Sequence, residues 1–161
     1  MRRLILCFTF ALLACVALGG TVLAESPHFV VTPTCTKSLS TGLTCSGKAA
    51  GLGNEPAFVF LTADSVSATY ICVNNGGNTA PGQGIVTQNV VGPVQQIAPH
   101  DGQITFAATL PPPPTPNSVV VCPNGNWTVR LTSLTYTNVV LHIQNAAGTD
   151  LLTFAFGTLD P

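Results

Sequence analysis

Few residues of this chain have the types and spacing that catalysis or metal binding requires. The three histidines, His28, His100 and His142, stand far apart, and none belongs to an H-x-H or H-E-x-x-H pattern. No G-x-S-x-G motif marks a nucleophilic serine. The six acidic residues are scattered, and none has a recognisable partner of the kind that a glycosidase needs. The sequence therefore predicts no catalytic residue, no metal site and no cofactor.

Two of the histidines have simple structural interpretations. His100 and Asp101 are adjacent, but Pro99 before them and Gly102 after them make this a turn, so we interpret the pair as solvated. His142 alternates with apolar neighbours, which predicts that its side chain faces solvent or a neighbouring strand.

The cysteines predict two disulfides. Cys35, Cys45, Cys72 and Cys122 are separated by 10, 27 and 50 residues, without the C-x-x-C spacing that is typical of structural zinc. Four cysteines allow three pairings. We favour Cys35–Cys45, because the segment between them has the Ser, Thr and Gly content of a hairpin turn, and Cys72–Cys122 follows.

Two features could bind a ligand. One is the polar loop 74–84, in which Asn74, Asn75, Asn78 and Gln83 could form hydrogen bonds with hydroxyl groups. The alternative is turn chemistry, since Asn and Gly adopt positive φ angles. The other feature is Trp127, which could stack on a sugar ring. Because it is in phase with Val129 and Leu131, we interpret it as a core residue.

The N-terminus has the pattern of a secretory signal peptide. Arg2 and Arg3 precede the apolar run 4–18, and residues 22–24 form an A-x-A-like cleavage site. The run is short for a membrane span, which takes about 20 residues. A lipoprotein signal is a second alternative, because residues 12–15 loosely resemble a lipobox with Cys15 as the modified residue, but Leu13 is bulky for such a motif and the apolar run continues past Cys15. We therefore predict a signal peptide over 1–24 and one mature domain over 25–161.

The composition of the mature part restricts its partners. It keeps three Lys or Arg residues against six acids. These are too few cations to neutralise many phosphates, which argues against nucleic acid as a partner. It contains no apolar stretch long enough to cross a membrane. We expect a secreted, extracellular or cell-surface protein whose partner, a protein or a glycan, is unknown.

The remaining pattern is that of β-strands without helices. Thr, Val, Gly, Asn and Pro are abundant, and apolar residues alternate with period two. Within 134–144 the alternation changes phase, which predicts a β-bulge near Thr137–Asn138. Residues 146–150 are predicted to form a hairpin loop. The predicted strands are 29–32, 43–49, 57–63, 68–73, 85–91, 104–110, 119–122, 127–132, 134–144 and 151–156.

Many short strands with turns between them predict two packed antiparallel sheets, a β-sandwich. Tyr70, two residues before Cys72, resembles the immunoglobulin pattern, although Trp127 follows this cysteine instead of preceding it. The fold class is therefore predicted as all-β, an antiparallel, immunoglobulin-like sandwich with two disulfides.

A second resemblance covers most of the mature chain. The run from Cys72 to Gln83, C-x-N-x-G-G-N-x-x-P-G-Q, and the later Cys122-Pro123 with Trp127 resemble a group of short exported bacterial proteins. The group has no assigned activity, so the resemblance implies a secreted β domain and no mechanism. The leading hypothesis is a non-enzymatic structural or adhesive module, and the alternative is a secreted hydrolase or carbohydrate-active protein.

Overall fold

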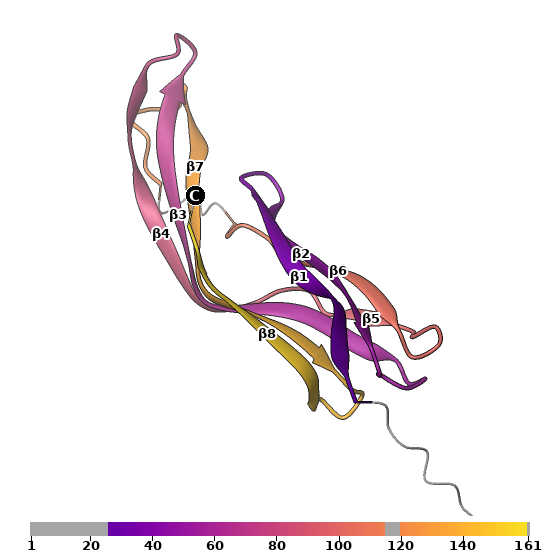
Figure 1. The fold of residues 1–161 in the computed structure, drawn as a ribbon. Coiled ribbons are helices and arrows are strands. Elements are labelled where there is room, and N and C mark those ends of the chain that lie inside the picture. Colours follow the sequence, from indigo (N-terminus) through magenta and orange to yellow (C-terminus); the bar gives the residue numbers. More distant parts are fainter. Residues whose placement is uncertain (1–25, 115–119, 161) are drawn as a thin grey trace, which may run out of the picture.

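The computed structural model describes residues 26–114 and 120–160. They form strands joined by short turns and a few longer connections, and this part of the chain contains no helix (Figure 1). The strands are β1 (His28–Ser38), β2 (Gly42–Ala50), β3 (Ala57–Asn74), β4 (Thr79–Val91), β5 (Gln95–Ile97), β6 (Ile104–Leu110), β7 (Trp127–Gln144) and β8 (Asp150–Leu159).

The strands form two antiparallel sheets, so the predicted β-sandwich is confirmed. The smaller sheet has the order β1-β2-β6. The larger has the order β4-β3-β7-β8, and β5 pairs with β3 near the start of that strand. β3 and β7 are the long central strands, and they pair along almost their whole length.

The core lies between the sheets and follows the alternation of each strand. In β3, Val59 and Leu61 are fully buried while their neighbours face outward, and β7 contributes Leu141 in the same way. A buried polar contact crosses the core, because the Tyr136 hydroxyl donates a hydrogen bond of 3.2 Å to the carbonyl oxygen of Leu110 in β6. At the margin of the core, the Lys37 ammonium of β1 donates one of 3.0 Å to the carbonyl oxygen of Leu134 in β7. Burial raises the pKa of the Tyr136 phenol, and a hydrogen bond with the Leu43 backbone acts in the opposite direction.

The larger sheet bends across its middle, and the smaller sheet lies on the inner side of the bend (Figure 1). The buried residues of β3 have odd numbers before Asp64 and even numbers after it, and those of β7 have even numbers before Asn138 and odd numbers after it. The register of the two strands places Asp64 and Asn138 opposite each other. Asn138 has a φ of 52°, and the β7–β8 register shifts beside it. The bulge predicted at Thr137–Asn138 is confirmed.

The bend continues into both outer strands. In β4, Asn89 stands opposite Asp64 and has a φ of 52°. In β8, Gly157 pairs with Val139 and has a φ of 72°. Left-handed residues therefore lie at one level in β4, β7 and β8, whereas β3 passes this level at Asp64 without one.

Several predicted strand limits are wrong. The segments 57–63 and 68–73 belong to the single strand β3, and 127–132 joins 134–144 in β7. In both cases the buried residues change from one set of alternate positions to the other within a single strand, and in β7 this change coincides with a register shift between Leu131 and Ser133. Residues 120–122 lie outside the strands, and Val119 lies outside the described residues. The short strand β5 was not predicted.

The disulfides differ from the immunoglobulin arrangement, in which the bridge joins the two sheets. Cys35 and Cys45 both lie in the smaller sheet, whereas Cys72 in β3 is joined to Cys122 in the connection before β7. The Tyr70 hydroxyl has no hydrogen-bond partner among the described residues, so it does not form the backbone contact of a tyrosine corner there.

Candidate functional site

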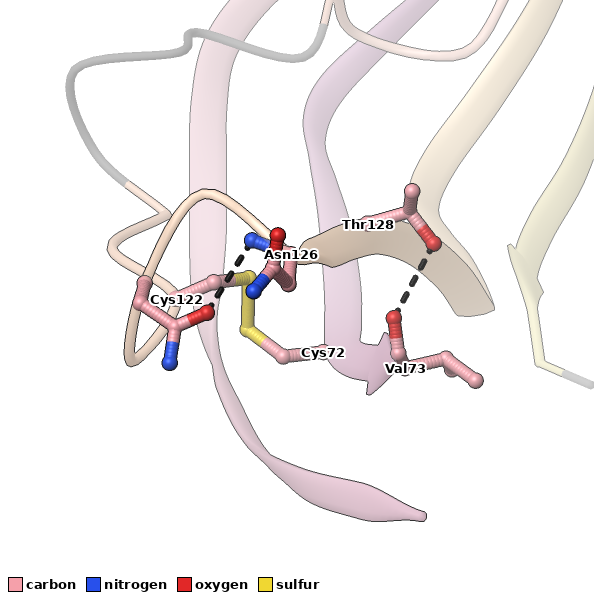
Figure 2. Close-up of a disulfide and its surroundings, with 6 residues drawn as sticks. Cys72, Val73, Cys122, Asn126 and Thr128 are labelled. Carbon is pink, nitrogen blue, oxygen red and sulfur yellow. Dashed lines mark hydrogen bonds between the residues drawn. A yellow bond between two sulfur atoms is a disulfide. The ribbon is translucent and has the colours of Figure 1, made fainter. Parts of the chain in front are cut away.

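Both predicted disulfide pairings are confirmed. Cys35 and Cys45 are direct partners across the β1–β2 hairpin, with their Cα atoms 4.0 Å apart. Cys72 lies near the end of β3, and its Cα is 5.7 Å from that of Cys122 (Figure 2). The second bridge holds the connection before β7 against β3, next to the point where the Thr128 hydroxyl donates to the Val73 carbonyl oxygen.

The predicted binding loop is much shorter than expected. β3 ends at Asn74 and β4 begins at Thr79, so the part of the segment after Asn78, including Gln83, lies in a strand. The Asn74 carboxamide oxygen accepts hydrogen bonds from the backbone N–H groups of Gly76 (3.0 Å) and Asn78 (2.9 Å). The prediction of a long loop is therefore wrong. The turn uses the Asn74 side chain, and of the Asn and Gly residues in the alternative interpretation only Gly77 has a positive φ, of 77°.

The predicted binding residues are divided between the hairpin tip and strand β4. Asn75 and Asn78 are exposed at the tip of the hairpin, and Gln83 is exposed on the edge strand β4. Trp127, at the start of β7, is partly buried and lies outside the core cluster, whereas Val129 and Leu131 pack against that cluster. The interpretation of Trp127 as a core residue is therefore wrong, because the ring lies at the end of the sheet.

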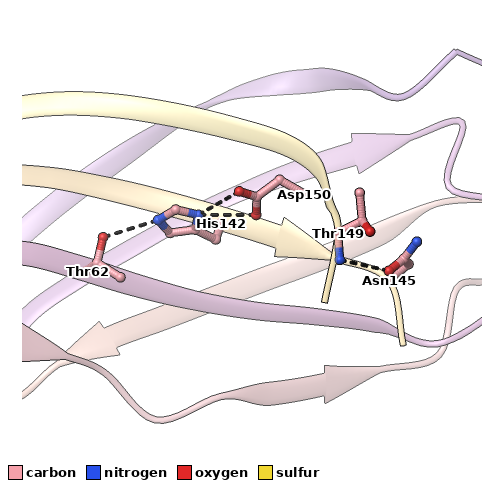
Figure 3. A network of polar contacts seen from close by, with 5 residues as sticks. All are labelled: Thr62, His142, Asn145, Thr149 and Asp150. Carbon is pink, nitrogen blue, oxygen red and sulfur yellow. Dashed lines mark hydrogen bonds and ion pairs between the residues drawn. The ribbon is translucent and has the colours of Figure 1, made fainter. Parts of the chain in front are cut away.

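The most organised polar cluster comes from three neighbouring strands of the larger sheet (Figure 3). Nδ1 of His142 in β7 lies 3.1 and 3.3 Å from the carboxylate oxygens of Asp150 at the start of β8. Its Nε2 lies 3.1 Å from the hydroxyl of Thr62 in β3. An ionised carboxylate only accepts, so Nδ1 donates to Asp150, and in the neutral imidazole Nε2 accepts the Thr62 hydroxyl proton.

Local sequence patterns place these side chains. Thr62 and Phe60 alternate with core residues of β3, so they face away from the smaller sheet. His142 is the direct partner of Phe60 across β3 and β7, and their rings stack at 5.0 Å with an interplanar angle of 11°. Asp150 follows a turn in which the Asn145 side-chain oxygen accepts from two backbone N–H groups, including that of Thr149 (Figure 3). The prediction that His142 faces a neighbouring strand is confirmed.

This chain of hydrogen bonds has the order of a hydroxyl–histidine–carboxylate triad, but its surroundings differ from those of a hydrolase. Thr62 lies in the middle of β3, where its partners are Val91 on one side and Val140 on the other. The backbone amides around it belong to the two ladders, so they cannot stabilise an oxyanion. The His142 side chain is 20% exposed and that of Asp150 39%, on an open sheet face. The cluster is better suited to binding than to nucleophilic catalysis.

A pocket of about 330 Å³ lies elsewhere, beside the turn that contains His100. His100 Nδ1 is 3.1 Å from the Asp101 carboxylate, and their side chains are 95% and 87% exposed. Asp101 has a φ of 51°, so the predicted solvated turn is confirmed. Both side chains are exposed, so this pair is not a desolvated acid and base. Its lining consists of Lys48, Ile97, Ala98, His100, Asp101, Gln103, Ile104 and Thr105.

Sequence reasoning missed the partners of two acids. It assigned none to Asp150 or Asp64, which contact His142 and Asn138, respectively. The second contact joins residues 74 positions apart, so only strand pairing brings them together. The first was within reach, because a histidine shortly before a hairpin turn and an acid at its end lie on adjacent strands.

Within residues 26–114 and 120–160, no group of three or more His, Cys, Asp or Glu side chains could hold a metal ion. In the same ranges no helix has the length and apolar character of a membrane span. The fold and cluster define a disulfide-linked β-sandwich with a polar and aromatic patch on an open sheet face. Comparisons with protein families, curated proteins and solved structures found no match to this chain.

Proposed function

We propose that the chain is an exported, non-enzymatic β-sandwich module that binds a partner outside the cell. The observation that carries this proposal is the position of its best-ordered polar cluster: His142, Asp150 and Thr62 lie on an open sheet face. Such a face lets an extended surface or polymer approach, whereas enzymes enclose their reacting groups.

Export is supported by two independent features. Two intramolecular disulfides fit an oxidising, extracellular compartment. Residues 1–24 have the charge, apolar stretch and small-residue end of a signal peptide. N-terminal sequencing of the exported protein should give Glu25 as the first residue. A lipid-modified Cys15 would instead place the protein on a membrane surface.

The test of the proposed function compares binding with turnover. The full chain is exported from a bacterial host, purified from the medium and incubated with insoluble cell-wall material and secreted polymer. We expect saturable retention on one of these fractions. Chromogenic esters and glycosides should be hydrolysed no faster by the natural chain than by His142→Ala. Turnover that disappears in Thr62→Ala, His142→Ala and Asp150→Asn would overturn the proposal in favour of a secreted hydrolase.

A further inference from the structure

Two phenyl rings stand on the outer face of the larger sheet, where a sheet in contact with water is normally polar. Phe58 and Phe60 alternate with the buried residues Val59 and Leu61, and both are partly exposed. The smaller sheet packs on the opposite face of β3. Among the described strands, none packs over these rings, so their exposed parts remain available to a ligand, apart from the face of Phe60 that stacks on His142.

Strand register surrounds each ring with hydrogen-bonding side chains. Phe58 has Gln144 of β7 as its direct partner on one side and Gln96 of β5 on the other. Gln144 in turn pairs with Asp150 of β8. Direct partners share a face, so this row spans four strands, about 14 Å at the usual strand spacing.

A second row lies one pleat further along the strands. Phe60 pairs with His142, which pairs with Thr153 of β8. His142 is held from both sides by Thr62 and Asp150, so its ring is already fixed before a ligand arrives. A fixed side chain loses little conformational entropy on binding.

From this patch we infer the ligand class: the outer face around Phe58, Phe60, Gln96, Gln144, His142 and Asp150 binds a neutral glycan. The inference rests on the proposed function and specifies its ligand. Aromatic rings pack against the C–H faces of sugars, and carboxamides both donate to and accept from hydroxyl groups. Asp150 accepts hydroxyl protons, and it is 39% exposed while bound to His142. The six residues include a carboxylate and no Lys or Arg, so they disfavour an anionic ligand.

The experiment measures binding of the full secreted chain to neutral oligosaccharides of four to six sugar units, first on a glycan array and then by titration calorimetry. Phe58→Ala should weaken binding of the best ligand about tenfold or more, and so should Asp150→Asn. Gln88→Ala, an exposed change on β4, is the control and should leave the affinity unchanged. The melting temperature of each variant shows whether it has folded.

Three results would overturn the inference: no neutral glycan bound by the natural chain, binding that Phe58→Ala and Asp150→Asn leave unchanged, or salt-sensitive binding of lysine-rich peptides alone. If Phe58→Ala and Asp150→Asn are still retained saturably on the cell-wall or polymer fractions, the glycan-binding inference is wrong and the proposed function stands. If the natural chain is not retained on these fractions and hydrolyses chromogenic substrates in a way that depends on His142, both the glycan-binding inference and the proposed function are wrong.

Discussion

The carboxamide of Asn138 donates a hydrogen bond of 2.7 Å to the carboxylate of Asp64, at the level where both central strands turn their buried face. The two residues stand opposite each other in the β3–β7 register. Asn138 also has a left-handed backbone conformation, with a φ of 52°. The same side chain therefore serves the bend twice, by tolerating positive φ and by joining the two strands.

This relationship predicts different costs for two substitutions of Asn138. Asn138→Ala loses the hydrogen bond to Asp64, and alanine tolerates the left-handed region less well than asparagine does. We therefore expect about 1–2 kcal/mol of destabilisation. Asn138→Gly keeps the backbone conformation and should cost less than the alanine variant. Chemical denaturation measures both. Equal stability of the two variants and the natural chain would mean that core packing alone sets the bend.

A matched pair of glycines in β4 tests the close approach of this strand to β3. A Cβ at Gly82 would overlap the Tyr70 carbonyl oxygen, whereas the nearest atom to a Cβ at Gly84 is 3.7 Å away. We expect Gly82→Ala to destabilise the fold by about 1–3 kcal/mol, since the backbone has to shift. Gly84→Ala should stay within about 0.5 kcal/mol of the natural chain. Similar melting temperatures for the two variants would contradict the β3–β4 geometry.

Tyr136 predicts an alkaline limit of stability. Its phenol has a pKa raised above the ordinary 10.0, mainly by burial, so the folded state holds the proton more tightly than the unfolded state. The stability that this proton contributes is complete below pH 10 and is lost as the pH rises from there through the folded pKa.

Tyr136→Phe should cost about 1–2 kcal/mol at pH 7, because the Leu110 carbonyl oxygen loses its donor. The difference between this variant and the natural chain should shrink above pH 10. Urea denaturation at pH 7 to 11 measures both effects. A constant difference over the whole range would show that the phenol does not titrate on unfolding.

The two disulfides should contribute unequally. Cys72–Cys122 closes a loop with a sequence separation of 50 and Cys35–Cys45 one of 10. Chain entropy then gives about 4 kcal/mol for the longer loop and somewhat under 3 kcal/mol for the shorter. We expect Cys72→Ser to lower the melting temperature more than Cys35→Ser does. The double variants Cys72→Ser/Cys122→Ser and Cys35→Ser/Cys45→Ser, which leave no unpaired thiol from the broken bridge, serve as controls. A larger loss of melting temperature for Cys35→Ser would show that the hairpin bridge contributes more to stability.

Local sequence was sufficient for the fold class and for the covalent framework. The period-two alternation of β6 and β7, the absence of helical periodicity and the turn between Cys35 and Cys45 each depend on neighbouring residues only. The change of parity between Tyr136 and Val139 likewise located the bulge, because successive side chains of a strand point to opposite faces.

What the sequence could not decide was which residues meet across strands. In the segment 57–63 both the odd-numbered and the even-numbered residues are largely apolar. Alternation alone therefore does not decide which set enters the core, and the structure buries Val59 and Leu61 while Phe58 and Phe60 face outward. Pairing of β3 with β7 made that choice and set Phe60 beside His142. Register over long separations depends on the packing of whole sheets, and only the tertiary structure contains it. The disulfides and the sandwich were therefore determined by sequence, whereas the bent sheet and the His142–Asp150 face were decided by tertiary structure.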